Sequence, residues 1–257
     1  MVISIIIITL NEIENIEKTI EMAKNSAKMS SGSVIPIEII VSDGGSEDGT
    51  IEIAKELADK VVIGPRGRYL QLNTGAKLAE ADILLFLHAD TLLPKGAILR
   101  IVHQLKDPNL IGGGFKKNWN WKPYVKRSSF LKFMNYFWEA MGNWLVRVFK
   151  SFPGDNAIFV RKNVFDEIKG FKPLWICEDF DFSRRLKKYG KHRIIYFPFP
   201  VLTSTRRFEK YGFFKVVFMW HLIYFLWRLG MSANRLRVRF NKYSTVPEKG
   251  DKEYLRF

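Results

Sequence analysis

The sequence predicts an α/β protein with a doubly wound, mostly parallel sheet flanked by helices and an amphipathic helical region at its C-terminal end. Three observations predict this fold class. Short apolar runs of strand length alternate with helix-like stretches through the first half of the 257 residues. The connections between them are short, as in β-α-β units. The first run, residues 2–8, consists mainly of β-branched residues, which is typical of a strand buried on both faces of a parallel sheet.

The first half of the sequence divides into four strand–helix units. The predicted strands comprise residues 2–8, 38–41, 61–63 and 82–87, and the predicted helices comprise residues 11–28, 50–58, 68–79 and 94–105. Asp43 follows the second strand, before Gly44, and the turn His88-Ala89-Asp90 follows the fourth. Because ligands of a doubly wound sheet bind beyond the carboxyl ends of its strands, Asp43 and Asp90 are candidate ligand contacts.

The second half has a different pattern. A predicted strand at residues 110–115 contains three consecutive glycines, which is typical of a strand that another segment approaches closely. Apolar residues at helical spacing predict an amphipathic helix over residues 130–148. Further strands are predicted at residues 157–160 and 194–197, with a helix at residues 179–189 between them.

Residues 213–229 form the most hydrophobic stretch of the chain. Lys215, His221 and Arg228 interrupt it, so its apolar runs are much shorter than the roughly 20 residues that a membrane span needs. Aromatic residues flanked by basic ones are typical of a helix that lies in a membrane interface, although a core helix or a homodimer interface fits the same pattern. The basic tail after Ser232 is predicted to be loosely ordered. We therefore expect a domain at residues 1–210 and a hydrophobic, basic helical extension at residues 211–257.

The charge balance predicts a polyanionic partner. Lysine and arginine number 41 against 26 aspartates and glutamates, which gives a net charge of +15. Nucleotide phosphates, a phospholipid surface and nucleic acid all fit this excess, and charge alone does not rank them. The single cysteine, Cys177, excludes an intrachain disulfide, and the N-terminus lacks the basic start and cleavage site of a signal peptide, so we expect a cytoplasmic protein.

Asp43 and the turn at residues 88–90 carry chemistry that suits a nucleotide. The carboxylate of Asp43 can accept hydrogen bonds from a base or ribose, or it can organise the turn that follows, since Asp-Gly is a common turn pair. His88 and Asp90 alternate on one side of the strand. Asp90 can hold Mg²⁺ or Mn²⁺, which take few protein ligands and complete their shell with phosphate and water; the alternative is a cap of the helix near Pro94. For His88, a metal ligand and a buried, hydrogen-bonded histidine both remain open.

Four more polar clusters are candidates. Arg66 and Arg68 lie between a strand and a helix, where glycine-flanked arginines suit phosphate binding, unless the segment is a solvated loop. Glu178 and Asp179 begin a helix, whose dipole they would stabilise. Their apolar surroundings would also raise a carboxylate pKa toward the working range of a general base. The remaining clusters are Gly154-Asp155-Asn156 and Arg206-Arg207.

Taken together, these segments resemble the family 2 glycosyltransferases of the GT-A fold. The resemblance rests on Thr9-Leu10-Asn11-Glu12, Ser42-Asp43-Gly44, His88-Ala89-Asp90, Gly154-Asp155-Asn156 and Glu178-Asp179, which follow one another in the order of the family. It covers residues 1–210 of the sequence. The motifs at residues 64–68, 87–91 and 205–208 look most like a small, non-processive bacterial and archaeal branch of that family.

The resemblance implies a role for each matching position of the donor site. Thr9, Asn11 and Glu12 would line the nucleotide pocket, and Asp43 would contact the base or the ribose. Asp90 would bind a divalent metal, Mg²⁺ or Mn²⁺, together with the diphosphate of a nucleotide sugar.

The resemblance also implies the catalytic residues. Asp179 would deprotonate the acceptor hydroxyl, with Glu178 as its supporting neighbour, which gives in-line displacement with inversion. Arg206 and Arg207 would hold the diphosphate or an anionic acceptor. One departure concerns the metal motif, in which His88 stands where the family usually has the first acid.

Missing features narrow the expected activity. The Gln-x-x-Arg-Trp signature of processive synthases and long membrane spans are absent from the sequence, which favours transfer of a single sugar. We expect a lipid-linked phosphate or a glycan as acceptor, and a peripheral position at the inner face of the cell membrane. A sugar-phosphate nucleotidyltransferase is the alternative enzyme, but it would carry a glycine-rich basic loop in place of residues 9–12. A non-catalytic nucleic-acid or membrane-binding module explains the charge but not the acids at successive strand ends, so nucleic acid is not an expected partner.

Overall fold

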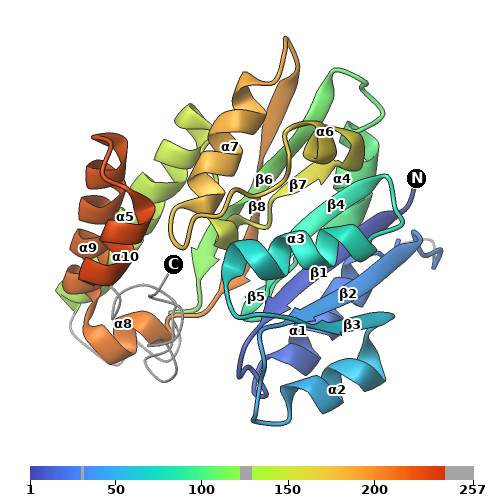
Figure 1. Cartoon of the computed structure of the whole chain (residues 1–257), viewed down its shortest axis with the longest axis horizontal. Helices are drawn as coiled ribbons and strands as arrows, with labels where there is room; N and C mark the ends of the chain where they lie inside the picture. The colour runs from blue at the N-terminus through green and yellow to red at the C-terminus, as the bar shows by residue number, and fades with distance from the viewer. Residues whose placement is uncertain (30–31, 122–128, 241–257) are drawn as a thin grey trace.

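One twisted sheet with helices on both faces forms the centre of the molecule (Figure 1). The computed structural model of the chain describes residues 1–29, 32–121 and 129–240. Its strands are β1 (Ile3–Thr9), β2 (Ile37–Asp43), β3 (Lys60–Ile63), β4 (Ile83–His88), β5 (Thr91–Leu92), β6 (Leu110–Trp119), β7 (Phe159–Arg161) and β8 (Arg193–Thr203). Its helices are α1 (Ile16–Ser26), α2 (Thr50–Leu57), α3 (Arg68–Leu78), α4 (Ala97–Gln104), α5 (Ser129–Phe149), the 3₁₀ turn η1 (Gly154–Asn156), α6 (Lys162–Glu167), α7 (Glu178–Lys188), α8 (Arg206–Tyr211), α9 (Phe213–Arg228) and α10 (Ala233–Phe240). The strand order is β3-β2-β1-β4-β7-β6-β8-β5.

The N-terminal half of the sheet is parallel, as predicted. Strand β1 pairs with β2 from Ile3 to Thr9 and with β4 on its other side, and β2 pairs with β3. The register places Asp43 opposite Thr9 and His88 opposite Ile8. Because these strands run in one direction, their carboxyl ends meet at one edge of the sheet and bring the predicted donor-site residues together.

The other half of the sheet is mixed. Strand β7 runs antiparallel to β4 and β6, β5 runs antiparallel to β8, and β6 is parallel to β8. The glycines of β6 lie where a side chain would not fit. A Cβ at Gly112 would lie 2.4 Å from the carbonyl oxygen of Phe159, and one at Gly113 would lie 2.1 Å from that of Ile195. The predicted close approach along this strand is therefore confirmed.

The alternating side chains of β1 divide the core into two layers. Ile5 and Ile7 belong to a buried cluster with residues of α1, α2 and α4, whereas Ile6 and Ile8 belong to a cluster with residues of α3, α6 and α7. The run of isoleucines is thus buried on both faces of the sheet.

A third layer of helices lies beside the sheet. Trp119 and Trp121, at and just beyond the end of β6, pack with Phe208 of α8 and with Phe213 and Val216 of α9. Leu236 of α10 packs in a separate cluster near the start of α7. Within the described part of the chain, no helix is long and apolar enough to cross a membrane. The boundary at residue 210 stays a prediction.

Several predicted elements differ from the structure. Strands β6 and β8 extend to Trp119 and Thr203, beyond the predicted ends at residues 115 and 197. The helix expected at residues 11–28 begins only at Ile16, because Asn11 adopts a left-handed conformation with φ of 53° and the following residues form a turn. The tail after Ser232, expected to be loosely ordered, forms α10, which is stabilised by burial of Leu236; residues 241–257 lie outside the described residues. Strand β5 and the short helices α6 and α8 were not predicted.

Candidate active site

The segments after β1 and β2 are held together by side-chain hydrogen bonds. The backbone N–H of Asn11 donates to the hydroxyl of Ser46 at 2.8 Å, and the side-chain oxygen of Asn11 accepts from the N–H of Glu47 at 3.0 Å. The hydroxyl of Thr9 is buried without a hydrogen-bond partner in the described part of the chain. An unpaired buried hydroxyl beside a loop is a candidate contact for a ligand.

Asp43 organises the turn that follows β2. Its side chain is fully buried, and its carboxylate accepts hydrogen bonds from the N–H groups of Gly45 and Ser46, both at 2.7 Å, and from the Ser46 hydroxyl at 2.6 Å. The turn interpretation of Asp43 is therefore confirmed. An ionised carboxylate can accept about four hydrogen bonds, which leaves capacity for one from a ligand.

Gln71 is a site residue that the sequence analysis missed. Its amide donates from α3 to the carbonyl oxygens of Thr9 at 2.7 Å and of Ser42 at 3.0 Å, so it fixes the ends of β1 and β2 to each other. A Cβ at Gly44 would lie 3.2 Å from this amide. The sequence feature that could have identified Gln71 is its position as a polar residue among the apolar positions of a helix that covers the sheet.

Arg206 links the first and fourth strand ends. Its guanidinium lies 2.5 Å from the carboxylate of Glu12 and 3.5 Å from that of Asp90. Burial raises the pKa of Glu12, although the neighbouring Arg206 acts in the opposite direction. Asp90 keeps a quarter of its side chain exposed. The predicted cluster Arg206-Arg207 is thus brought to the predicted metal acid, from the far end of the sequence.

Glu178 and Asp179 form a buried acid pair at the start of α7. Arg68 lies 2.9 Å from the Glu178 carboxylate and 3.9 Å from that of Asp179. Burial raises the pKa of Glu178 to about 7 and also raises that of Asp179, while Arg68 lowers both. Arg68 therefore contacts the acid pair, and Arg66 lies half-buried in the loop before α3; the role of either arginine at a phosphate stays a prediction.

Gly154 brings the turn after β4 next to the acid pair. Its N–H donates to the carboxylate of Asp179 at 2.6 Å, and a Cβ at this position would lie 2.8 Å from Nε2 of His88 and 3.5 Å from the Asp179 carboxylate. Burial, followed by the nearby charge of Arg68, lowers the pKa of His88 to about 4. The imidazole is therefore neutral at physiological pH.

The rest of η1 anchors this part of the site. Asp155 forms an ion pair with Lys117 of β6 at 2.8 Å, and this pair holds the pKa of Asp155 below its usual value against the opposing effect of burial. Asn156 is fully buried and donates to the carbonyl oxygen of Phe115 at 2.6 Å, so it supports the loop. Lys117 was missed because the predicted strand ended two residues before it.

Arg207 faces Trp220 of α9. Its guanidinium lies 5.8 Å from the centre of that ring, and Lys117 lies 6.0 Å from the same centre. Burial, followed by the charge of Arg68, lowers the pKa of Arg207. Two cations therefore lie close to one aromatic ring, and one of them, Lys117, pairs with Asp155.

Among these residues, the carboxylate of Asp90 is the one that is placed to bind a divalent metal. No group of three or more His, Cys, Asp or Glu side chains that could hold a metal ion occurs in the described residues. Asp90 is partly exposed and its ion pair with Arg206 is long at 3.5 Å, so its oxygens are accessible to a cation. Such a donor set fits Mg²⁺ or Mn²⁺ only when phosphate oxygens supply further ligands.

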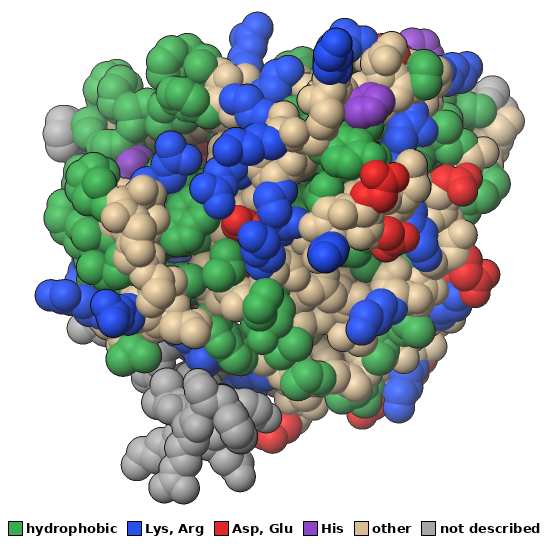
Figure 2. Space-filling view, turned by 45° about the horizontal axis from the view of Figure 1, so that its top comes forward, with side chains coloured by type: hydrophobic (Ala, Val, Ile, Leu, Met, Phe, Trp, Pro, Cys, Tyr) green, Lys and Arg blue, Asp and Glu red, His purple; other side chains and the backbone are tan. Residues whose placement is uncertain are grey.

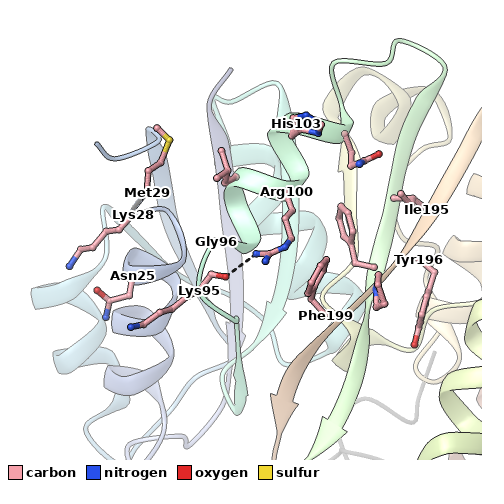
Figure 3. A pocket seen from close by; sticks show the side chains of 14 residues that line it. Asn25, Lys28, Met29, Lys95, Gly96, Arg100, His103, Ile195, Tyr196 and Phe199 are labelled. Carbon is pink, nitrogen blue, oxygen red and sulfur yellow. Dashed lines mark hydrogen bonds between the residues drawn. The ribbon is translucent and has the colours of Figure 1, made fainter. Parts of the chain in front are cut away.

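A large cavity lies elsewhere. About 1060 Å³ of space lies between α1, α4 and β8, where Arg100 donates to the carbonyl oxygen of Lys95 and stacks on Phe199 (Figure 3). None of the predicted site residues lines it. The candidate active site is therefore defined by the strand ends and the start of α7, and not by this cavity.

Comparison with known proteins identifies the family of this chain. The family model described as Glycosyl transferase family 2 matches residues 4–169. The glycosyltransferase AglE of Haloferax volcanii is 35% identical over 95 residues, which is 34% of this chain and 30% of AglE. This chain therefore aligns with about a third of that curated relative.

Solved structures show the same fold. The mannosyltransferase PcManGT from Pyrobaculum calidifontis aligns with a TM-score of 0.62 and 20% identity, over 90% of this chain and 65% of that one. TarS from S. aureus gives a TM-score of 0.56 and 18% identity, over 80% of this chain and 61% of that one. Glucosyl-3-phosphoglycerate synthase from Mycobacterium tuberculosis gives 0.56 and 16%, over 96% and 81%. The predicted GT-A-type fold is confirmed.

Proposed function

The chain belongs to glycosyl transferase family 2 and is a glycosyltransferase, and we propose that it moves a single sugar from a nucleoside-diphosphate donor to an acceptor hydroxyl with inversion. The observation that carries this proposal is the position of Asp179. Its buried carboxylate accepts from the N–H of Gly154, next to His88 and at the edge of the sheet where the donor-site residues gather.

In the proposed reaction, Asp179 takes the proton of the acceptor hydroxyl. The acceptor oxygen forms a bond to the anomeric carbon while the bond from that carbon to the diphosphate oxygen breaks, and the diphosphate leaves with the electron pair. A carboxylate whose pKa is raised by burial is a better base near neutral pH than an exposed one. Arg68 holds Asp179 and Glu178 in place.

For donor binding, we propose that the nucleotide lies across the ends of β1 and β2. Thr9 offers a hydroxyl that has no hydrogen-bond partner among the described residues, and Asn11 and Asp43 shape the loops around it. The diphosphate would lie near Asp90 and Arg206, with Arg66 as a further candidate contact. Asp90 would hold a divalent cation, which would neutralise the charge on the leaving diphosphate.

The related structures suggest which donors to test. PcManGT is described with GDP-Man and Mn²⁺, and the synthase from M. tuberculosis with UDP and Mn²⁺. TarS is described with UDP-GlcNAc. A thermal-shift screen of GDP, UDP and these sugar nucleotides, each with Mg²⁺ or Mn²⁺, would identify the donor because a ligand of the native state raises its melting temperature.

For the acceptor, we propose a lipid-linked phosphate or glycan used by a cytoplasmic, membrane-peripheral enzyme. The support comes from the net charge of +15 and from exposed aromatic side chains on α9, among them Phe218. Arg207 and Lys117, which both lie close to Trp220, suit an acceptor that carries phosphate.

The decisive test is Asp179→Asn. Release of nucleoside diphosphate in the presence of acceptor should fall by about 10²-fold or more, while the affinity for the diphosphate should change by less than about twofold, since the charge is removed on the acceptor side. Asp166→Asn, on the exposed side of α6, is the matched control. Turnover close to that of the parent protein would refute Asp179 as the base. Asp90→Ala should weaken diphosphate binding with Mn²⁺ far more than without it.

A further inference from the structure

Exposed aromatic residues are concentrated on two helices. Nine phenylalanine, tyrosine or tryptophan side chains are exposed among the described residues, and all except Phe199 belong to α5 or α9. These eight are Phe133, Tyr136, Phe137, Trp144, Phe149, Phe214, Phe218 and Phe225. Figure 2 shows hydrophobic side chains gathered at the upper left of the molecule, on the side where α5 and α9 lie in Figure 1.

The two helices present the same pattern of exposed side chains. Phe133, Phe137, Trp144 and Val148 follow α5 at steps of four, seven and four residues, and Phe214, Phe218, Phe225 and Leu229 follow α9 and its end at the same steps. Residues at these steps lie along one side of a helix. We call these eight residues the docking face.

The helices that carry the docking face pack against each other. The ring of Trp138 on α5 lies 5.5 Å from that of His221 on α9. Trp138 also joins the buried cluster that contains Phe213 and Val216 of α9. The inward sides of both helices are therefore used for packing, and the docking face remains outside.

The surroundings of the docking face are basic. Arg147 on α5 and Arg228 on α9 occupy equivalent positions in the two stripes, three residues after Trp144 and Phe225, and both are exposed. Further exposed cations are Lys215 on α9 and Arg235 and Arg239 on α10. The only acidic residue in the sequences of α5, α9 and α10 is Glu139, which is turned inward and accepts from Trp119 and Trp121.

We propose that the docking face binds an anionic phospholipid surface, with the aromatic side chains in the interface and the cations at the lipid headgroups. The proposal rests on the proposed function, because it supplies the acceptor from a membrane. The proposal also places half of the contact with the phospholipid surface on α5. A second copy of this chain fits less well, because a two-fold interface would bring the same cations of both copies together with no acid to oppose them.

The position of α9 connects the docking face with the active site. Its inward side carries Trp220, which lies beside Arg207 and Lys117, and Lys117 pairs with Asp155 of η1. An α-helix with side chains is about 10 Å across. The acceptor that fits this arrangement is an amphiphile whose phosphorylated head reaches the site past α9 while its chain stays in the lipid.

The test measures sedimentation of the full chain with vesicles of phosphatidylcholine that contain phosphatidylglycerol. The variants are Phe133→Gln/Phe137→Gln on α5 and Phe218→Gln/Phe225→Gln on α9. The matched control is Leu78→Gln/Leu99→Gln, which removes exposed leucines from α3 and α4. Circular dichroism checks that each variant is folded, and Arg147→Gln/Arg228→Gln changes the charge without touching the aromatic residues.

Each aromatic double variant should bind the anionic vesicles at least about tenfold more weakly, whereas the control should stay within about twofold. The charge variant should lose affinity mainly at low salt, because salt screens its contribution. Unchanged vesicle binding by the α5 variant would overturn the proposal. It would also be overturned by a dimer in analytical ultracentrifugation that the α5 variant converts to monomers, with no binding of vesicles.

A separate measurement distinguishes failure of this proposal from failure of the proposed function. Slow release of GDP or UDP from the sugar nucleotide in water needs the donor site but no membrane. The vesicle-binding variants should release nucleotide at the parent rate. Vesicle binding without any turnover of nucleotide sugars would refute the proposed function but not the membrane-binding proposal. Turnover without vesicle binding would refute the membrane-binding proposal but not the proposed function.

Discussion

Replacing Glu178 with glutamine should change how the stability of the protein depends on pH. Glu178 is 1% exposed, and burial raises its pKa from the usual 4.5 to about 7. Between these values the folded protein keeps a proton that the unfolded chain has lost. The contribution of Glu178 to stability is therefore fully present below pH 4.5 and is lost as the pH rises through 7.

His88 acts in the opposite direction over nearly the same range. Burial lowers its pKa from the usual 6.5 to about 4, so between these values the unfolded chain binds a proton that the folded protein does not. Its contribution is fully present above pH 6.5 and is lost as the pH falls through 4. In the parent protein, these two contributions offset each other.

The expected size follows from the difference between the folded and unfolded pKa values. For Glu178, the step from 4.5 to about 7 corresponds to about 3 kcal/mol at about 1.4 kcal/mol per pH unit, and His88 gives a similar value of opposite sign. The Glu178→Gln variant should therefore gain about 3 kcal/mol relative to the parent protein between pH 4.5 and pH 7.5.

Urea unfolding followed by circular dichroism at these two pH values measures the difference. The control is Glu21→Gln, which makes the same chemical change at an exposed position of α1, away from the buried acid pair. An equal difference in unfolding free energy between Glu178→Gln and the parent protein at pH 4.5 and at pH 7.5 would contradict this expectation. It would then follow that Glu178 ionises in the folded state as it does in the unfolded chain.

Three further changes have expected outcomes. Gly113→Ala would place a methyl group 2.1 Å from the carbonyl oxygen of Ile195, so the free energy of unfolding should fall by about 3 kcal/mol or more in urea titrations. Asp43→Ala leaves two N–H groups of its turn without their acceptor and should cost about 2–4 kcal/mol in the same assay, with partial recovery in Asp43→Asn. Arg206→Gln should weaken the binding of GDP or UDP without metal by about tenfold. It should also lower the Mn²⁺ concentration that half-saturates nucleotide binding, because Asp90 loses its competing cation. Calorimetric titration measures both effects.

The repeating part of the fold could be predicted because its signal is local. The isoleucine run of β1 has the composition of a strand that is buried on both faces, and all seven of its residues are buried. The start of α1 could not be predicted from periodicity. The N–H groups of Asn11, Glu12 and Ile13 donate to side chains at positions 46, 50 and 48, and these long-range bonds hold the segment in a turn.

The positions of the acids in the candidate site could be predicted from the sequence, whereas those of Lys117 and Arg68 could not. Asp43 and Asp90 follow strands, and strands of one parallel sheet end at one edge, so their proximity follows from topology. Lys117 reaches the site only because β6 continues beyond the predicted strand, which no turn signal indicates. Arg68 was expected at a phosphate, but burial of Glu178 requires a nearby countercharge, and Arg68 is the residue that provides it.

In the segment that the resemblance implies would bind a metal, His88 stands at the position expected for the first acid. Because its pKa is lowered, His88 is neutral near pH 7 and adds no charge, and Asp90 remains as the one acid of the motif. In the free protein, Arg206 lies between Asp90 and Glu12 and supplies the positive charge that a metal would otherwise bring. A single carboxylate that already has a cationic neighbour binds a divalent ion weakly, whereas a diphosphate can both attract Arg206 and offer oxygen ligands. We therefore expect the metal and the donor to bind together. Without Arg206, the affinity for the metal should rise, while the metal-free affinity for the diphosphate should fall.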